Sequence, residues 1–143
     1  MQSYGFVGTG ELTAAIVEGI SGGNPPQVFL SPRNHGIAHD LAGRFPNVRI
    51  CGSNQEVLDR TAVVVIAVRP HITRDVLADL TFRPDHVVVS AAAGVALAEL
   101  RAHVSPAERI VRAIPLPTAS RRASCTAVYP DDAIARALFE SVG

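Results

Sequence analysis

Short apolar runs alternate with amphipathic stretches along the whole chain. Three of the runs are apolar almost throughout rather than at every second position, namely 62–68, 86–91 and 109–114. Continuous apolar character is typical of strands in a parallel sheet whose two faces are both covered by helices. These three segments are therefore the strongest strand predictions.

The remaining elements fill the intervals between these strands. Apolar periodicity and turn residues predict further strands and helices that alternate along the chain. The further strands are 3–7, 27–31, 48–51 and 124–129; the helices follow the turn at 8–10 as far as residue 20, then cover 34–44, 54–60, 73–80 and 97–103, and a last one is opened by Asp131. This order predicts an α/β protein: one doubly wound, mostly parallel, Rossmann-type sheet in a single domain, 1–143.

A glycine-rich turn leads from the first strand into the first helix. Gly8 permits a tight turn, and Gly10 removes the side chain that would block a phosphate at the helix N-terminus. Thr13 stands where this fingerprint normally has Gly or Ala. The motif alone is weak evidence, and a structural turn in a protein with another ligand is the alternative.

The end of the second strand carries no acidic residue to accept hydrogen bonds from an unphosphorylated ribose. It reads Ser31-Pro32-Arg33, and a hydroxyl with a guanidinium suits a 2′-phosphate. We therefore expect NADP rather than NAD, the alternative being that Arg33 is a solvated loop residue.

Other chain segments reach the same edge of the predicted sheet. Residues 67–71 follow the strongest strand, so Arg69 is expected near the cofactor phosphate or ribose, with a surface charge as the alternative. His71 is interpreted as a neighbour of a helix N-cap rather than as a functional residue. Asn54 is expected to cap its helix, with a second task at the cofactor. Small residues at 91–95 allow close approach of a flat ring, although tight helix packing explains them equally well.

Composition excludes several classes of function. The 143 residues are 48% hydrophobic and 18% charged, and 13 basic residues balance 13 acidic ones, so no nucleic-acid or membrane partner is indicated. All the basic residues are arginine, which excludes lysine chemistry. The N-terminus lacks the basic region of a signal peptide, and we expect a cytoplasmic protein.

Nucleophilic and metal chemistry find little support. Cys51 and Cys125 have no CxxC spacing, and no GxSxG segment occurs. His35 and His39 are four residues apart, as chelating helical histidines are, but no third ligand is indicated. No metal is expected, and no catalytic residue or proton donor is assigned.

Taken together, five ordered segments resemble the N-terminal domain of pyrroline-5-carboxylate reductase, the last enzyme of proline biosynthesis. The family shows G-x-G-x-M-x-x-A at the first turn, an Asn before the fourth strand, A-V-K-P-x after it, S-x-x-A-G after the fifth, and R-x-M-P-N-T-P. They are matched here by Gly8, Gly10, Leu12 and Ala15; by Asn54; by 67–70; by 90–94; and by 112–118. The resemblance covers essentially the whole chain.

The resemblance implies an oxidoreductase that moves a hydride from NADPH to the C=N of a cyclic imino acid, with that small molecule as its partner. The expected cofactor-binding residues are Gly8, Thr9, Gly10, Glu11, Leu12, Ser31, Arg33, Asn54, Ala67, Val68, Arg69, Pro70, Ala93 and Gly94. Ala93 and Gly94 would border the nicotinamide. The family's C-terminal helical domain, which completes the substrate pocket and the dimer, is expected to be absent, so a homodimer is expected only where that domain exists.

The chain departs from the family pattern at three places. Arg69 replaces Lys, Leu116 replaces the Asn of the proline-rich loop, and Pro117-Thr118 inverts the following T-P. Because Leu116 removes a polar group at the crevice between cofactor and substrate, it weakens the expectation of the family's substrate more than the expectation of its cofactor. Two alternatives therefore stay open: another NADP-dependent reductase, such as a deazaflavin-linked one, or a non-catalytic dinucleotide-binding module.

Overall fold

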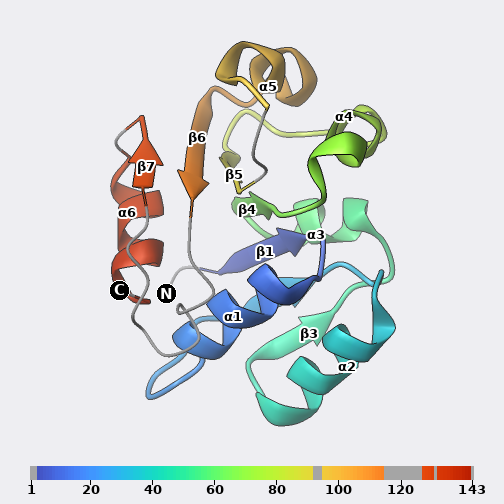
Figure 1. The fold of residues 1–143 in the computed structure, drawn as a ribbon, viewed down its shortest axis with the longest axis vertical. Helices are drawn as coiled ribbons and strands as arrows, with labels where there is room; N and C mark the ends of the chain where they lie inside the picture. The colour runs from blue at the N-terminus through green and yellow to red at the C-terminus, as the bar shows by residue number, and fades with distance from the viewer. Residues whose placement is uncertain (1–2, 92–94, 115–126, 131, 143) are drawn as a thin grey trace.

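The predicted doubly wound sheet is present in the computed structural model, which describes residues 3–91, 95–114, 127–130 and 132–142. Within these residues seven strands form one sheet in the order β3-β2-β1-β4-β5-β6-β7 (Figure 1). The first six are parallel, and β7 pairs antiparallel with β6. The strands are β1 (Tyr4–Val7), β2 (Val28–Leu30), β3 (Val48–Ile50), β4 (Val63–Ile66), β5 (Val87–Ser90), β6 (Arg109–Ile114) and β7 (Ala127–Tyr129).

Helices cover both faces of this sheet, as the apolar strands require. One face packs against α1 (Glu11–Ile20), α2 (His35–Arg44) and α6 (Ala133–Glu140). The other packs against α3 (Asn54–Arg60), α4 (Pro70–Ala78) and α5 (Leu97–Val104). Alternate residues along the central strands enter the two cores, so β4 gives Val63 and Val65 to the first and Val64 and Ile66 to the second. The single-sheet fold class is confirmed.

One predicted helix start and the residues that open two other helices are corrected. Helix α4 begins at Pro70 rather than at residue 73, because proline is favoured in the first turn of a helix. The cap of α3 is Ser53, whose hydroxyl accepts a hydrogen bond from Glu56 N–H, and Asn54 is the first helical residue. The cap of α6 is Asp132, whose carboxylate accepts from the N–H groups of Ile134 and Ala135. Asp131 lies outside the described residues.

Asp132 also joins α6 to the sheet. Both of its carboxylate oxygens accept hydrogen bonds from the Arg109 guanidinium at the start of β6, at 2.8–3.0 Å. Burial raises the pKa of Asp132, but the N–H groups of α6 and Arg109 outweigh it and hold the pKa below its ordinary value. The carboxylate is therefore anionic at neutral pH and anchors the C-terminal helix.

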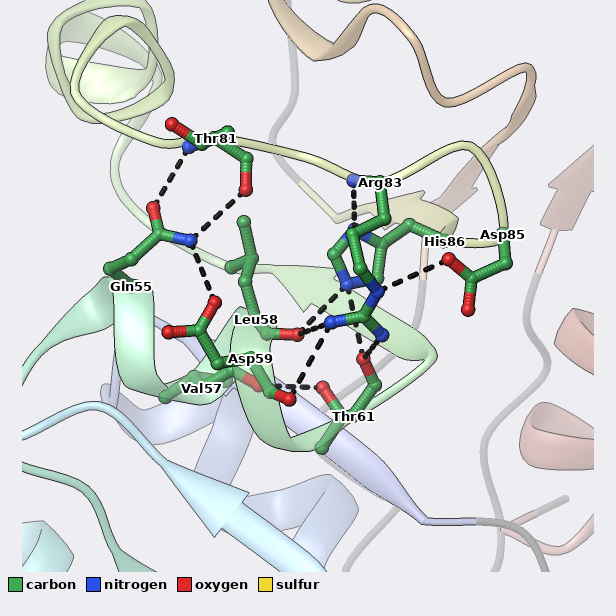
Figure 2. A network of polar contacts seen from close by, with 9 residues as sticks. All are labelled: Gln55, Val57, Leu58, Asp59, Thr61, Thr81, Arg83, Asp85 and His86. Carbon is green, nitrogen blue, oxygen red and sulfur yellow. Dashed lines mark hydrogen bonds and ion pairs between the residues drawn. The ribbon is translucent and has the colours of Figure 1, made fainter.

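A network of hydrogen bonds lies at the amino ends of β4 and β5 (Figure 2). The fully buried His86 ring accepts a hydrogen bond at Nδ1 from Arg83 N–H, so its Nε2 carries the hydrogen that faces the carbonyls of Leu58 and Thr61. The Arg83 guanidinium donates to the same two carbonyls. These contacts satisfy carbonyl groups at the end of α3, and His86 is accordingly part of the structural framework.

The opposite edge, at the carboxyl ends of the parallel strands, is where chain segments leave β1, β2, β4 and β5. Ligands of open α/β sheets bind in the crevice outside these ends. No helix in the described part of the chain combines the length and apolar character needed to cross a membrane.

Candidate functional site

The turn after β1 depends on the absence of a side chain at Gly8. Its φ is +100°, a conformation that L side chains rarely adopt. A Cβ at this position would lie 2.7 Å from the backbone C and O atoms of Ala67, at the end of β4. The expectation that Gly8 permits a tight turn is confirmed.

Gly10 has a different role in the same turn. Its φ is −105° and ψ is −165°, which other residues also adopt. A Cβ built there has no protein atom within 4 Å. Neither the backbone conformation nor packing requires glycine at this position, so the open space lies free for a ligand.

Ser31 and Thr9 lock this turn to the end of β2. The Ser31 hydroxyl accepts a hydrogen bond from Gly8 N–H at 2.9 Å, and Thr9 Oγ1 donates to the Ser31 carbonyl at 3.0 Å. The two hydroxyls are 3.1 Å apart, so Ser31 donates in turn to Thr9, and a chain of three hydrogen bonds runs from the Gly8 amide to the Ser31 carbonyl. Ser31 is fully buried and Thr9 nearly so.

This geometry changes the interpretation of Ser31. The sequence places its hydroxyl on a 2′-phosphate, but that hydroxyl is buried and already holds the Gly8 amide. In this arrangement Ser31 positions the turn and does not face a ligand.

Thr13 has a structural explanation that the sequence pattern did not supply. Its buried hydroxyl donates to the Gly8 carbonyl at 2.6 Å, from the first turn of α1. A Gly or Ala at this position offers no such donor. Thr13 therefore reinforces the turn from inside the fold.

The N-terminus of α1 faces the open side of the turn. Gly10 is the cap residue, and no side chain caps the helix. Among the described residues no acceptor outside the helix is found for the N–H groups of Gly10, Glu11 and Leu12. Such groups, together with the helix dipole, favour an anion.

A cleft of about 600 Å³ adjoins this helix end. It brings together chain segments that follow β1, β2, β4 and β5. Its lining residues are Gly10, Glu11, Leu12, Asn34, Ile37, Ala67, Val68, Arg69, Pro70 and Ala91. Seven of the predicted residues thus meet at one site, and exposed Arg69 contributes a positive charge with no side-chain partner among the described residues.

A second cavity of about 480 Å³ is lined by the predicted residues Arg33 and Asn54. Its other lining residues come from the start of α3 and from α4, and are Ser53, Gln55, Ile72, Asp75, Val76, Asp79 and Leu80. Arg33 is exposed, and Asn34, which follows it, lines the 600 Å³ cleft. Two adjacent residues after β2, Arg33 and Asn34, therefore line one cavity each.

Two residues that line the 600 Å³ cleft, Asn34 and Ile37, were not predicted from the sequence. Asn34 is the N-cap of α2 and has the left-handed conformation, φ 64° and ψ 64°, and Ile37 lies in the first turn of that helix. Asparagine tolerates this conformation better than most residues. An Asn directly after Arg33 at the end of a strand was therefore the sequence signal that could have placed Asn34 at the cleft. Ile37 carried none.

Other chemistry finds no support in the described part of the chain. Burial raises the pKa of the Cys51 thiol to about 11, which removes it as a thiolate nucleophile at neutral pH. No group of three or more His, Cys, Asp or Glu side chains there is arranged to hold a metal. Ala93, Gly94, Leu116 and Cys125 lie outside the described residues.

The strand order, the glycine turn and the uncapped helix end define a Rossmann-type domain of the dinucleotide-binding class. Residues 3–94 match the family model described as "NADP oxidoreductase coenzyme F420-dependent". The chain belongs to this family.

Similar proteins agree with this assignment. The pyrroline-5-carboxylate reductase of Escherichia coli is 34% identical over 138 residues, which are 91% of this chain and 50% of that enzyme. The crystal structure of the Streptococcus pyogenes enzyme superposes with a TM-score of 0.83 at 26% identity, over 99% of this chain and 56% of the other. The Plasmodium falciparum enzyme, solved with NADP bound, has a TM-score of 0.76 at 20% identity over 99% of this chain and 55% of the other. The chain spans about half the length of these relatives.

Substitution of the two glycines of the turn is expected to affect the stability of the protein to different degrees. Gly8→Ala should lower the free energy of unfolding by about 3 kcal/mol, from backbone strain and overlap with Ala67. Gly10→Ala meets no atom and should change it by less than about 1 kcal/mol. Urea unfolding of both variants measures this, and equal losses at the two positions would contradict the distinction.

Proposed function

We propose that this chain binds NADPH across the carboxyl ends of its strands, with the pyrophosphate at the N-terminus of α1. The observation that carries the proposal is the open position of Gly10, beside unpaired N–H groups and at the edge of a 600 Å³ cleft. A pyrophosphate requires this close approach to the backbone. The Gly8 amide donates to Ser31 Oγ, so the hydrogen bonds to the pyrophosphate are proposed to come from the N–H groups of Gly10, Glu11 and Leu12.

Arg33 is the proposed partner of the 2′-phosphate. It follows β2, where the adenosine ribose of such cofactors lies, and its guanidinium has no partner among the described residues. Arginine can bind a phosphate through two hydrogen bonds at once. Ser31 and Thr9 hold the glycine turn through their hydrogen bonds. Asn54 lines the same 480 Å³ cavity as Arg33.

The segment after β4 completes the cofactor site. Ala67 and Val68 line the cleft, and Pro70 is the first residue of α4. Arg69 is proposed to balance the negative charge of the diphosphate. Ala93 and Gly94 are proposed to border the nicotinamide, in keeping with their place just after β5. NADPH would supply the hydride when bound.

The proposed reaction is reduction of the C=N bond of a cyclic imino acid, as in the pyrroline-5-carboxylate reductases that this chain resembles. The chain spans about half their length. We propose that further protein, of the kind that forms the helical domain in that family, completes the imino-acid pocket. No proton donor is assigned to a residue of this chain.

A second candidate function is favoured by the family model. Its description names an NADP oxidoreductase that depends on coenzyme F420, which is a deazaflavin. The same cofactor cleft serves both reactions, since only the second substrate differs. Reduction of a deazaflavin in place of an imino acid would select this candidate.

Cofactor preference tests the role of Arg33. Arg33→Asp should weaken NADPH binding by about tenfold to a hundredfold, because charge-assisted hydrogen bonds are lost, and should shift preference toward NADH. Titration of each cofactor by calorimetry measures the change.

The matched control for this variant is Arg101→Asp, which makes the same charge change on exposed α5 away from both cavities. It should leave NADPH affinity within about threefold of the original, since exposed charges are screened. Unchanged NADPH affinity in Arg33→Asp would contradict the assignment.

Turnover tests the reaction. The purified 143-residue chain is expected to bind NADPH and to reduce pyrroline-5-carboxylate inefficiently, because part of the substrate site lies on further protein. Loss of NADPH absorbance gives the rate. Robust activity from this chain alone would contradict the need for a second domain, and absence of NADPH binding would overturn the proposed function.

A further inference from the structure

The exposed face of α2 carries two histidines that the proposed cofactor site does not use. His35 and His39 are four residues apart, so they are neighbours on one side of the helix. Both are exposed, whereas Ala38 and Leu41 on the other side of α2 are buried in the core. The pair lines neither of the two cavities, and it is therefore a separate surface feature.

The two imidazole rings lie beside each other. Their ring centres are 5.5 Å apart, and their planes differ by 14°. A divalent transition ion binds an imidazole nitrogen at about 2.0–2.1 Å, which places the centres of two rings on one ion about 4.5–5.5 Å apart. Histidine ring torsions are broad, so small rotations of these exposed rings bring one nitrogen of each to a common point. The side chains therefore already have the separation of a chelating pair.

No other side chain in the described part of the chain occupies the ring nitrogens. Neither His35 nor His39 has a hydrogen-bond or ion-pair partner there. Asp40, the carboxylate that follows His39, is instead bound to Arg44 at 3.0 Å. A neutral imidazole has one nitrogen with a free lone pair, and this atom is the metal ligand. Each ring thus has a lone pair available for an ion.

Two glycines leave the space around His39 open. Gly36 lies one turn before it and Gly43 one turn after it, and a Cβ built at either position meets no protein atom within 4 Å. An ion with its bound water therefore has room beside the pair. The same glycines weaken α2, whose cap residue Asn34 makes no side-chain capping hydrogen bond. A ligand that joins two turns of α2 would offset this weakness.

We propose that His35 and His39 form a binding site for a divalent transition-metal ion of the class of Ni²⁺, Cu²⁺ and Zn²⁺. The two imidazoles are the protein ligands, and water completes the coordination. Ions of this class bind imidazole well, whereas Mg²⁺ and Ca²⁺ prefer oxygen ligands. With two protein ligands the site differs from structural and catalytic zinc centres, which use three or four. The inference does not depend on the proposed cofactor function.

Calorimetric titration of the untagged 143-residue chain with NiCl₂ tests the site. One ion should bind per chain, and MgCl₂ at the same concentrations should not bind. His35→Gln and His39→Gln each leave a single imidazole on α2. Each should weaken Ni²⁺ binding by at least about tenfold, because the second ligand of a chelate binds intramolecularly.

The matched control is His71→Gln/His103→Gln, which removes two histidines on α4 and α5 and retains the pair on α2. It should keep the Ni²⁺ affinity within about twofold, since separate sites act independently. A rescue variant, His35→Gln/Gly43→His, recreates the four-residue spacing with His39 one turn further along α2. Because the space at Gly43 is open, this variant should recover binding to within about threefold of the original chain.

Urea unfolding gives a second readout. A ligand that binds the folded state in preference to the unfolded state stabilises the folded state. Excess Ni²⁺ should therefore raise the urea midpoint of the original chain and of His71→Gln/His103→Gln, and should leave the midpoint of His39→Gln unchanged. The midpoints without metal also show that every variant is folded.

Each outcome decides the inference. Weaker binding in both single variants, with retention in the control and recovery in the rescue variant, supports the site. Absence of Ni²⁺ binding by the original chain, unchanged affinity in either single variant, or loss of binding in the control would overturn it. NADPH titration of the same variants reports separately on the proposed function.

Discussion

The site depends on the close contact between the backbone of Gly8 and the backbone at the end of β4. A side chain at Gly8 would overlap Ala67, and Ala67 N–H donates to the Val7 carbonyl at 2.8 Å. This contact brings the glycine turn beside the segment that carries Arg69. The Ser31 hydroxyl then ties the turn to β2, and thus to Arg33. Three strand ends are fixed together by backbone contact and a few buried hydroxyls.

The amino and carboxyl ends of the parallel strands have different roles, the first structural and the second functional. At the amino ends, His86 and Arg83 hydrogen-bond to the carbonyls of Leu58 and Thr61 at the end of α3, which is a structural role. At the carboxyl ends, the N–H groups of Gly10, Glu11 and Leu12 at the start of α1 and the side chains of Arg33 and Arg69 are without partners among the described residues. Unsatisfied donors and cations at one edge are what an anionic dinucleotide requires.

Sequence reasoning recovered the sheet because its strands are apolar throughout and its turns carry Gly and Pro, which are local properties. It also recovered most of the cleft, since residues just past parallel strands must share one edge. It missed the roles of Ser31 and Thr13, whose hydroxyls bond across 23 and 5 residues of chain. Hydroxyl partners depend on tertiary contact, and no periodicity reports them. The cap of α3 was misplaced by one residue because Ser53 and Asn54 are both good capping residues.

The most direct test of the central claim follows backbone amides of the ¹⁵N-labelled chain by NMR during titration with NADPH. The account predicts that the amides of Gly10, Glu11 and Leu12 shift most as the pyrophosphate binds. The amide of Arg83, which donates to His86 at the opposite edge, should remain unchanged. Shifts confined to the amino edge, or no response at Gly10, Glu11 and Leu12 while the cofactor binds, would contradict it.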